Sequence, residues 1–538
     1  MKRSFDPILL EVYKNLFASI SEEMGVTLCR TAYSPNIKER RDFSCAVFDG
    51  SGMMVAQAAH IAVHLGSMPL SVASAIEHVS MKPGDVVLLN DPYRGGTHLP
   101  DVTMVSPVFP EGRKSPLFYV ANRAHHADIG GISPGSLPLS TEIFQEGIRI
   151  PPVRLVAGGA MQRDMLALLL ANVRTPRERE GDLTAQVAAN NVGARRLLEV
   201  CARHGIPEVR RYMKELKDYA ERMTRQAIDR IPDGEYAFED FLDDDGQGSG
   251  PIRVAVVITV RGDEAVIDLS GSAAQVRGSV NAIYAITLSA VFYVFRCIVE
   301  ADIPSNAGGM RPLRVVTRHG TVVDANFPAA VAAGNVETSQ RITDALLGAL
   351  SRAVPDRIPA ASSGTMNNIT VGGQDPRTGA PYAYYETIGG GSGATPRSDG
   401  ASAVQTHMTN TMNTPVEALE HAYPLRVRRY EVARGTGGRG RFIGGDGIRR
   451  ELEFVAPATV TVISERREIA PYGLFGGEPG RRGENRIVRA GGREERQPGK
   501  FSLPVEEGDR LCITTPGGGG YGKVSARADE TSDKRNGR

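Results

Sequence analysis

The chain has 538 residues, of which 41% are hydrophobic and 6% aromatic, and it contains no tryptophan. One hydrophobic core rarely serves so long a chain, so we expect several domains, and the apolar content is sufficient to fill them. The 63 lysine and arginine residues nearly balance the 62 aspartate and glutamate residues. This balance gives no reason to expect nucleic acid or an anionic membrane as a partner.

The cysteines and the hydropathy pattern indicate in which cellular compartment the protein is located. The five cysteines are scattered without a CxxC pair, which argues against a disulfide framework and against a zinc–cysteine site. No apolar run approaches the roughly 20 residues that a membrane span requires, and the first residues lack the apolar core of a signal peptide. We therefore predict a cytoplasmic protein without membrane contact, in which Cys297 is an inert core thiol on a helix spanning 282–298.

The N-terminal part is predicted to combine a helix with strand hairpins. Asp6 can cap a helix in which apolar residues recur at three- and four-residue steps. Two strands, 44–48 and 53–57, are joined by the sequence DGSG at 49–52, a strong hairpin signal. That turn superficially resembles the phosphate hairpin of actin-like ATPases, but without the partner motifs we interpret it as a turn.

Two histidines, His60 and His64, stand four residues apart, so on a helix they would share one face, as in metal-binding HxxxH arrangements. No glutamate follows His60, so the pair does not form the HExxH motif of zinc proteases. Gly66 and Pro69 interrupt the helical pattern, and histidines hydrogen-bonded at a packed turn explain the pair equally well.

The densest group of metal-capable side chains occupies residues 90–131, in two short turns joined by a predicted hairpin. Residues 102–109 and 116–121 are rich in β-branched and aromatic residues, and the sequence PEG at 110–112 separates them. A hairpin returns its ends to each other. The side chains before its first strand are therefore expected to lie beside those after its second strand.

Five candidate metal-binding or catalytic residues stand at these two ends: His98 and Asp101 at one, and His125, His126 and Asp128 at the other. Such residues also serve singly as turn formers and caps, but five in two joined turns favour a site. Two imidazoles with one or two carboxylates suit Mn²⁺, Zn²⁺ or Fe²⁺, and the residues do not choose among these ions. Asp42 is either a paired structural acid or a further ligand.

A second polar stretch lies between residues 334 and 417, where threonine, asparagine and glycine replace ordinary core residues. Hydroxyls, amides and free backbone N–H groups suit a small polar substrate or its phosphorylated form, although structural turns would use the same residues. The candidate substrate-binding residues, from this stretch and from the N-terminal part, are His64, Asn90, Glu337, Thr338 and Asn410. The three adjacent carboxylates at 243–245 are expected to form a solvated turn.

These patterns predict a mixed α/β (α+β), multidomain fold with a β-rich C-terminal region. The expected parts are an N-terminal α/β region with the metal-site hairpin (1–160), a helical region (161–232), an α/β region with polar loops (233–430), a β-rich domain (431–522) and a disordered tail (523–538).

Several runs together resemble the hydantoinase B/oxoprolinase family over nearly the whole chain. They are DFSCAVFD at 42–49, HLGSMP at 64–69, NDPY at 90–93, HLPD at 98–101, HHADIGG at 125–131, ETSQR at 337–341 and TNTMNTP at 409–415. The family includes subunits of ATP-dependent N-methylhydantoinases, 5-oxoprolinases, a caprolactam hydrolase, and acetone- and acetophenone-type carboxylases. Its metal site falls on His98, Asp101 and one of His125 or His126, with Asp42 as a possible additional ligand.

The resemblance implies a hetero-oligomer and a division of labour. An A-type subunit with an actin-like ATPase fold phosphorylates the substrate's carbonyl oxygen with ATP, and the B-type subunit completes the reaction at a divalent metal. The histidine of the 125/126 pair left unligated, or Asp128, would serve as general base or would orient a ligand. This chain lacks a GxxxxGK[ST] loop of its own.

We therefore expect an ATP-dependent hydrolase of a hydantoin, 5-oxoproline or another lactam. The alternatives are a subunit of an acetone- or acetophenone-type ketone carboxylase, a metallohydrolase that acts alone, and a non-catalytic scaffold for the A-type subunit. Carboxylase large subunits of the acetone type are longer than this chain, which favours cyclic-amide hydrolysis.

Overall fold

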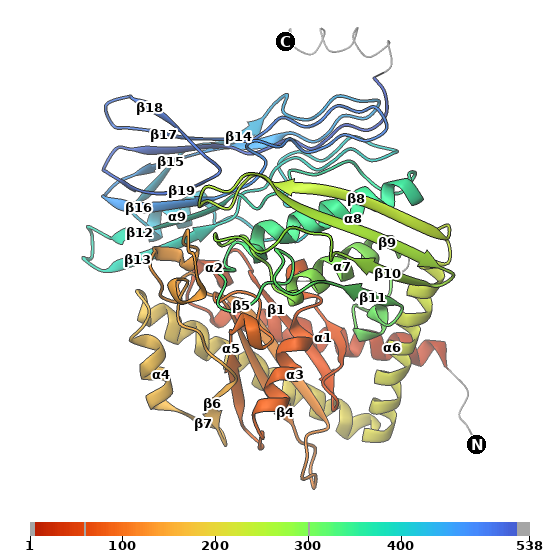
Figure 1. Ribbon diagram of the computed structural model, residues 1–538. Helices are drawn as coiled ribbons and strands as arrows, with labels where there is room; N and C mark the ends of the chain where they lie inside the picture. Colours follow the sequence, from red (N-terminus) through yellow and green to blue (C-terminus); the bar gives the residue numbers. More distant parts are fainter. Residues whose placement is uncertain (1–5, 59–60, 300–301, 525–538) are drawn as a thin grey trace.

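The computed structural model describes residues 6–58, 61–299 and 302–524 (Figure 1). Helices pack with four sheets of mostly antiparallel strands, which confirms the predicted mixed α/β fold. His60 and most of the predicted disordered tail lie outside the described residues. In the described ranges, no helix is both long and apolar enough to cross a membrane.

The first sheet has seven strands in the order β2-β1-β5-β4-β3-β6-β7. They are β1 (Phe43–Asp49), β2 (Met54–Gln57), β3 (Val86–Leu89), β4 (Asp101–Val108), β5 (Phe118–His125), β6 (Val153–Ala157) and β7 (Ala160–Met161). The predicted β1–β2 hairpin is confirmed, and the Asp49 carboxylate closes its turn by accepting hydrogen bonds from the N–H groups of Ser51 and Met53.

Strands β4 and β5 form the long hairpin expected between residues 102 and 121. They are antiparallel neighbours, and Asp101 lies opposite His125 in their register. Strand β1 pairs with the other edge of β5, with Phe43 opposite Ala124, so Asp42 comes to the same end of the sheet. The pairing of these three strands is therefore enough to bring Asp42, Asp101 and His125 to one end of the sheet.

Helices cover this sheet, as Figure 1 shows in its lower half. They are α1 (Pro7–Thr31), α2 (Pro35–Lys38), α3 (Met68–His78), α4 (Arg163–Leu170), α5 (Pro176–His204) and α6 (Ile206–Ile228). The carboxylate of Asp6 caps α1 by accepting hydrogen bonds from the N–H groups of Ile8 and Leu9, as predicted. One face of α1 packs with α5, α6 and the sheet in a buried apolar cluster that includes Phe17, Met24 and Leu197.

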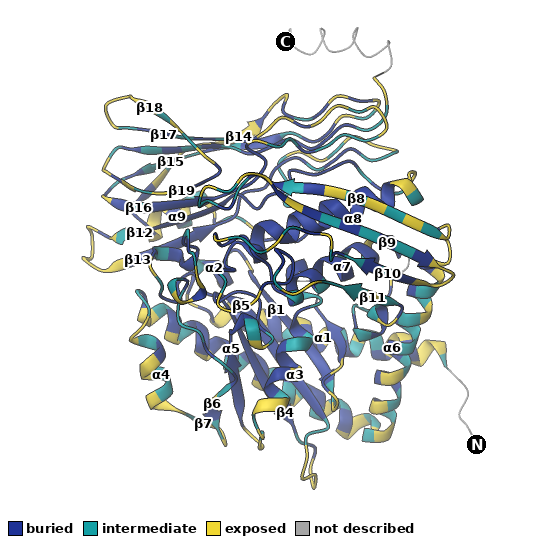
Figure 2. Cartoon of the chain, in the orientation of Figure 1, coloured by how far each residue is buried: buried dark blue, intermediate teal, exposed yellow. Residues whose placement is uncertain are grey.

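The second sheet, in the order β11-β10-β9-β8, lies above the first in Figure 1. Its elements and their helices are β8 (Gly234–Leu242), β9 (Ile252–Arg261), β10 (Glu264–Asp268), β11 (Leu313–Val316), α7 (Tyr284–Ile298) and α8 (Ser339–Ala353). Helix α8 is buried along most of its length, between this sheet and α7 (Figure 2). It carries the polar segment at 334–338 on its N-terminal end.

The remaining strands form two further antiparallel sheets, in the orders β13-β12-β16-β19 and β14-β15-β20-β17-β18. The elements are β12 (Asn368–Gln374), β13 (Pro381–Glu386), α9 (Val416–Ala422), β14 (Leu425–Ala433), β15 (Gly447–Phe454), β16 (Ala458–Ile463), β17 (Glu484–Val488), β18 (Glu494–Gln497), β19 (Lys500–Val505) and β20 (Arg510–Thr514). The C-terminal region is thus rich in strands. One sheet joins strands from both sides of residue 430, and the domain division stays a prediction.

The glycine-rich stretches do more than turn the chain. Extended segments pass so closely that backbone packs on backbone: a Cβ atom on Gly391 would lie 1.8 Å from the carbonyl oxygen of Gly445, and one on Gly518 would lie 2.0 Å from that of Ser392. Hydrogen bonds join the same segments, from Gly445 N–H to Ser392 and from Gly518 N–H to Gly445. Only glycine permits this approach.

This packing favours the structural one of the two roles that the sequence leaves open for the stretch 385–394. The backbone N–H groups of Gly390, Gly391 and Ser392 donate to the carbonyl groups of Val404, Pro516 and Ala401. These glycines therefore serve the packing of the chain.

We predict that Gly518→Ala lowers the free energy of unfolding by at least about 2 kcal/mol, because the new methyl group overlaps a carbonyl oxygen in a packed interior. The matched control is Gly491→Ala, since nothing lies within 4 Å of a Cβ at that position. Thermal denaturation of both variants measures the difference, and equal Tm values would contradict the backbone packing described above.

Candidate metal centre

Three buried side chains converge at one end of the β4–β5 hairpin. His98 lies just before β4, Asp101 is the first residue of β4, and His125 is the last residue of β5. The Oδ1 atom of Asp101 lies 3.2 Å from His98 Nε2 and 3.3 Å from His125 Nδ1. One donor atom from each residue falls within 4.8 Å of the others, which is the spacing of ligands around a single ion.

A distant segment fixes the orientation of His98. Its Nδ1 atom lies 3.0 Å from the carbonyl oxygen of Ala332, so Nδ1 carries the hydrogen and donates it. The amide of Ala332 is itself held by the carboxylate of Glu146, at 3.0 Å. This chain of contacts presents the other ring nitrogen, Nε2, to Asp101, as in histidines that bind metals.

The carboxylate of Asp101 is surrounded by donors. Its Oδ2 atom lies 2.7 Å from the Thr97 hydroxyl, 3.3 Å from His64 Nε2 and 3.4 Å from Asn335 Nδ2. Burial alone would raise the pKa of Asp101, but His98 and His64 hold it well below its usual range. The group is therefore an anion at neutral pH.

The residues present fit a divalent cation. When His98 is neutral, its Nε2 lone pair faces an oxygen of the Asp101 carboxylate at 3.2 Å, and two acceptors at this distance require a proton or a cation between them. Burial lowers the pKa of His125 to about 3, so its imidazole is neutral and able to coordinate. Its Nε2 atom is buried without a hydrogen-bond partner.

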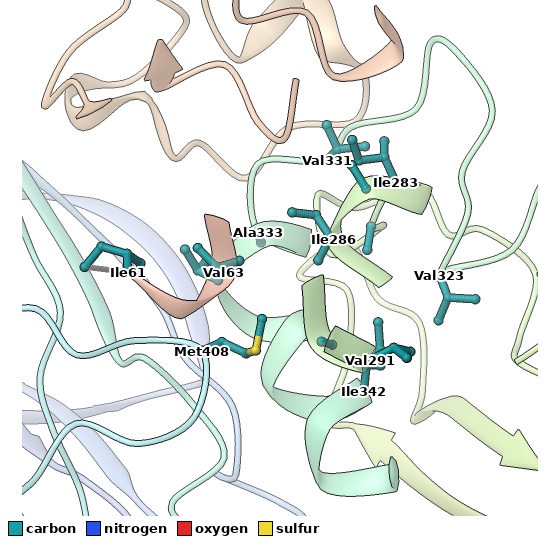
Figure 3. Close-up of a cluster of buried hydrophobic side chains, with 14 of the residues drawn as sticks. Ile61, Val63, Ile283, Ile286, Val291, Val323, Val331, Ala333, Ile342 and Met408 are labelled. Carbon is teal, nitrogen blue, oxygen red and sulfur yellow. The ribbon is translucent and has the colours of Figure 1, made fainter. Parts of the chain in front are cut away.

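A small cavity of about 20 Å³, here called the inner cavity, adjoins the triad and has room for about one water molecule. Asp42, His64, Asn335 and Tyr385 contribute to its polar wall, whereas Ile61, Val63 and Met408 form apolar parts. Figure 3 shows Met408 beside Val63 in the surrounding hydrophobic cluster. Burial raises the pKa of Asp42 to about 7, against the opposing effect of Arg40, and a nearby cation would favour its ionised form.

The structure does not bring the other two hairpin residues to the triad. His126 is buried on the opposite side, with Nε2 2.9 Å from Gln186 Oε1. Asp128 forms an ion pair with Arg174 at 2.9 Å and accepts a hydrogen bond from its backbone N–H. Neither side chain contacts the triad, and His126 Nδ1 is buried without a hydrogen-bond partner.

Of the predicted substrate-binding residues, two line a cavity and three bind other parts of the fold. His64 lines the inner cavity, and Asn410 is exposed and lines a larger neighbouring cavity. Asn90 instead binds the backbone of Leu99 and Ile150, and Thr338 donates to the carbonyl oxygen of Val280. The carboxyl of Glu337 accepts hydrogen bonds from the Met366 N–H group and the Asn368 side chain, and Glu337 does not line the inner cavity.

The family model of hydantoinase B/oxoprolinase matches residues 6–524. The chain belongs to the hydantoinase B/oxoprolinase family. This membership confirms the resemblance found in the sequence motifs.

Named members of this family and related solved structures extend the comparison. A 5-oxoprolinase of Dictyostelium discoideum is 40% identical over 96% of this chain, which spans only 40% of that protein's length. The crystal structure of an ATP-dependent caprolactamase from Pseudomonas jessenii has a TM-score of 0.91 at 33% identity and covers 99% of this chain and 94% of its own. An acetone carboxylase has the same TM-score of 0.91 at 19% identity, covering 99% of this chain and 78% of its own, which shows a shared fold alone.

In this member of the hydantoinase B/oxoprolinase family, several residues at the centre are not among those predicted from the sequence. Asn335 lies 3.0 Å from His98 Nε2, and the ring of Tyr385 stacks on that of His125 with centroids 4.5 Å apart. Thr387 and Thr411 line the inner cavity. Thr411 belongs to the motif TNTMNTP, and Asn335 lies in the polar stretch two residues before ETSQR, which was the available signal. Nothing local distinguishes Tyr385 or Thr387 from ordinary strand residues.

Two further expectations need correction. Cys297 is exposed rather than a core thiol, because α7 turns this position toward the larger cavity. The acidic run at 243–245 is not a solvated turn, since Asp243 and Asp245 are buried. Their carboxylates accept backbone hydrogen bonds, among them those from Arg467 and Gly278, and so join distant segments.

We predict that Glu337→Gln makes stability less dependent on pH. Burial raises the pKa of Glu337 to about 8 from an ordinary 4.5, with a smaller effect from Glu465. A carboxyl whose pKa is raised by folding stabilises the protein below its unfolded pKa, and this contribution is lost as the pH rises through about 8. The wild-type free energy of unfolding should therefore fall between about pH 5 and 8, by up to about 1.4 kcal/mol per pH unit from this group.

Denaturation at several pH values checks this expectation. The matched control is Glu235→Gln, since Glu235 is exposed on β8. Parallel pH profiles for Glu337→Gln and the wild type would show that Glu337 is already ionised in the folded protein.

Proposed function

We propose that this chain is the metal-dependent part of an ATP-dependent enzyme that hydrolyses a cyclic amide. The observation that carries the proposal is the convergence of buried His98, Asp101 and His125 beside a cavity for one water molecule. Membership of a family with relatives named 5-oxoprolinase, and similarity to a solved caprolactamase, support a ring-opening reaction.

His98, Asp101 and His125 would hold the ion, and Asp42 is placed to complete the ligand set. A divalent metal lowers the pKa of bound water and polarises a carbonyl or phosphoryl oxygen when it is present. Which of Mn²⁺, Zn²⁺ and Fe²⁺ is native is a matter for measurement, since the oxygen and nitrogen donors suit each of them.

The other side chains of the centre orient the two histidines of the triad and enclose the inner cavity. The Ala332 carbonyl fixes the tautomer of His98, and the stacked ring of Tyr385 restricts rotation of His125. His64 contacts the Ser44 hydroxyl through Nδ1 and the Asp101 carboxylate through Nε2, so it helps to orient Asp101 beside the inner cavity. The apolar wall of that cavity excludes bulk water, which strengthens each of these electrostatic interactions.

ATP is proposed to act at a partner, because this sequence contains no GxxxxGK[ST] loop while the caprolactamase it resembles is ATP-dependent. An A-type, actin-like ATPase subunit would phosphorylate the amide oxygen and so convert it into a leaving group. The 5-oxoprolinase relative is consistent with this arrangement, since most of its length has no counterpart in this chain.

Ketone carboxylation is the second candidate, because the acetone carboxylase structure shares this fold. Fold similarity alone does not identify a reaction. The higher sequence identity to the caprolactamase favours hydrolysis of a cyclic amide.

We expect the purified chain to hold about one divalent transition ion, and His98→Ala and Asp101→Ala to lose most of it, since each removes one donor from a small ligand set. The matched control is His126→Ala, which removes a neighbouring buried imidazole that contacts Gln186 instead of the triad. Elemental analysis gives the metal content, with circular dichroism to verify folding. Equal metal content in all four proteins would move the site to other residues.

In the complex reconstituted with the ATPase partner, His98→Ala should abolish ring opening while leaving part of the substrate-stimulated ATP consumption. The phosphorylated substrate can still form at the partner and decay in water, so the two activities separate. The quantity to measure is ATP consumed per product formed, again with His126→Ala as the comparison. A ratio unchanged from the wild type, at whatever residual rate, would remove this centre from the second half-reaction and favour the scaffold alternative.

A further inference from the structure

A buried arginine stands behind the inner cavity without a carboxylate partner. The side chain of Arg40 is 0% exposed. Its guanidinium donates to Asn36 Oδ1, to the Tyr385 carbonyl oxygen, and to the hydroxyls of Thr387 and Thr411, all of them neutral groups. In the ranges that the structure describes, it forms no ion pair. A buried cation that no ion pair neutralises polarises the neutral groups that accept its hydrogen bonds, here the hydroxyls of Thr387 and Thr411.

Other buried arginines show two different arrangements. Arg450 is paired with Glu386 at 3.0 Å, and Arg466 is paired with Asp240 and Asp344. Arg123 also donates only to hydroxyls, those of Ser67, Ser71 and Thr103, but none of these three residues lines the inner cavity. Arg40 is distinguished from Arg123 because both of its threonine partners line that cavity.

The donor and the acceptor can be assigned in the hydrogen bonds of these threonines. Thr387 Oγ1 lies 2.9 Å from an Arg40 nitrogen and 3.3 Å from Gln405 Nε2, and both nitrogens can only donate to it. Its own hydrogen is then donated to Thr411 Oγ1, 2.8 Å away. Thr411 in turn accepts from Arg40 at 3.4 Å, which leaves its hydrogen for the inner cavity or for Thr409 at 3.5 Å. A donor polarised by a cation therefore faces the cavity.

The donors are held in place by the fold itself, because the Arg40 guanidinium and both threonine hydroxyls are fixed by hydrogen bonds to one another. Preorganised donors of this kind stabilise an anionic atom, as in an oxyanion hole.

We infer that the inner cavity binds a single anionic oxygen of the ligand, from a carboxylate or a phosphoryl group, between the triad and the Thr387–Thr411 hydroxyls polarised by Arg40. This inference rests on the proposed function and deepens it. The oxygen belongs either to the phosphorylated amide or to the carboxylate that hydrolysis produces. Arg40 acts through the two threonines and is a positioning residue.

The rest of the ligand has a place beside this position. A second cavity of about 630 Å³, within the usual size range of small-molecule sites, shares Thr409 with the inner cavity. Gln405, which donates to Thr387, also lines it. The inner cavity then accepts one oxygen atom while the larger cavity accepts the body of the molecule.

Calorimetric titration of the purified chain with inorganic phosphate, and separately with acetate, tests the inference. Thr411→Val removes the hydroxyl that donates to the anion, and Thr387→Val removes the hydroxyl that orients it, while both substitutions keep the shape. Each should weaken anion binding about tenfold, the usual effect of one charge-assisted hydrogen bond. Thr387→Ser keeps the hydroxyl and should retain wild-type affinity. Tighter binding of phosphate assigns the position to a phosphoryl oxygen, and tighter binding of acetate assigns it to a carboxylate oxygen.

The matched control is Thr103→Val, because Thr103 also accepts a hydrogen bond from a buried arginine but lies outside the cavity. It should leave anion affinity unchanged. Unchanged affinity in Thr387→Val and Thr411→Val, an equal loss in Thr103→Val, or no binding of either anion to the wild type would overturn the inference.

Titrations repeated on chelator-treated protein separate this inference from the proposed function. If the triad holds no metal, the metal contents of His98→Ala and the wild type agree. The affinity difference between Thr387→Val and Thr387→Ser still reports the anion position in that case. Arg40→Lys, which keeps the charge but loses the fork of donors, should fall between the wild type and Arg40→Met.

Discussion

The register of β4 against β5 is the constraint on which the centre depends. Successive side chains of a strand point to opposite faces, so a slip of one residue would exchange the faces of every side chain. With Asp101 opposite His125, that imidazole faces the carboxylate, while the adjacent His126 faces Gln186. The sequence left the choice between these two histidines open because both follow the same strand, and only the register and the helix behind the sheet decide between them.

Local patterns predicted much of the fold. The DGSG turn indicated the first hairpin, and β-branched and aromatic residues on both sides of PEG indicated the second. A capping aspartate indicated the first helix, because all these signals act between near neighbours in the chain. The centre was partly predictable for the same reason, since His98, Asp101 and His125 stand at the ends of one hairpin. Composition was a weaker guide: glycine serves turns and close backbone packing alike, and the sequence of the stretch 385–394 does not distinguish them.

The other half of the centre comes from segments that no local pattern connects. Asn335, Tyr385 and Thr411 reach the hairpin from far along the chain, and Arg40 contacts Thr387 and Thr411 across more than 340 residues of sequence. Each of these residues obeys ordinary rules of strand or loop composition on its own. Their relation exists only in the folded chain, so the sequence does not predict it, although Asn335, Tyr385, Thr387 and Thr411 line the inner cavity and Arg40 supports two of them.

The fold tolerates these polar groups because well-satisfied structure surrounds them. Several atoms at the centre have no partner, including His125 Nε2 and Asn335 Oδ1, and each costs free energy in a buried position. The apolar cluster around Ile61, Val63 and Met408 offsets that cost and keeps water out. Unpaired donors and acceptors that converge on one small space gain most from a ligand that satisfies them together, so binding and folding stability are linked at this position. A cation would satisfy the acceptor atoms of the triad, and an anionic oxygen would satisfy the donor at the threonine hydroxyls. Each would strengthen the binding of the other through their mutual attraction.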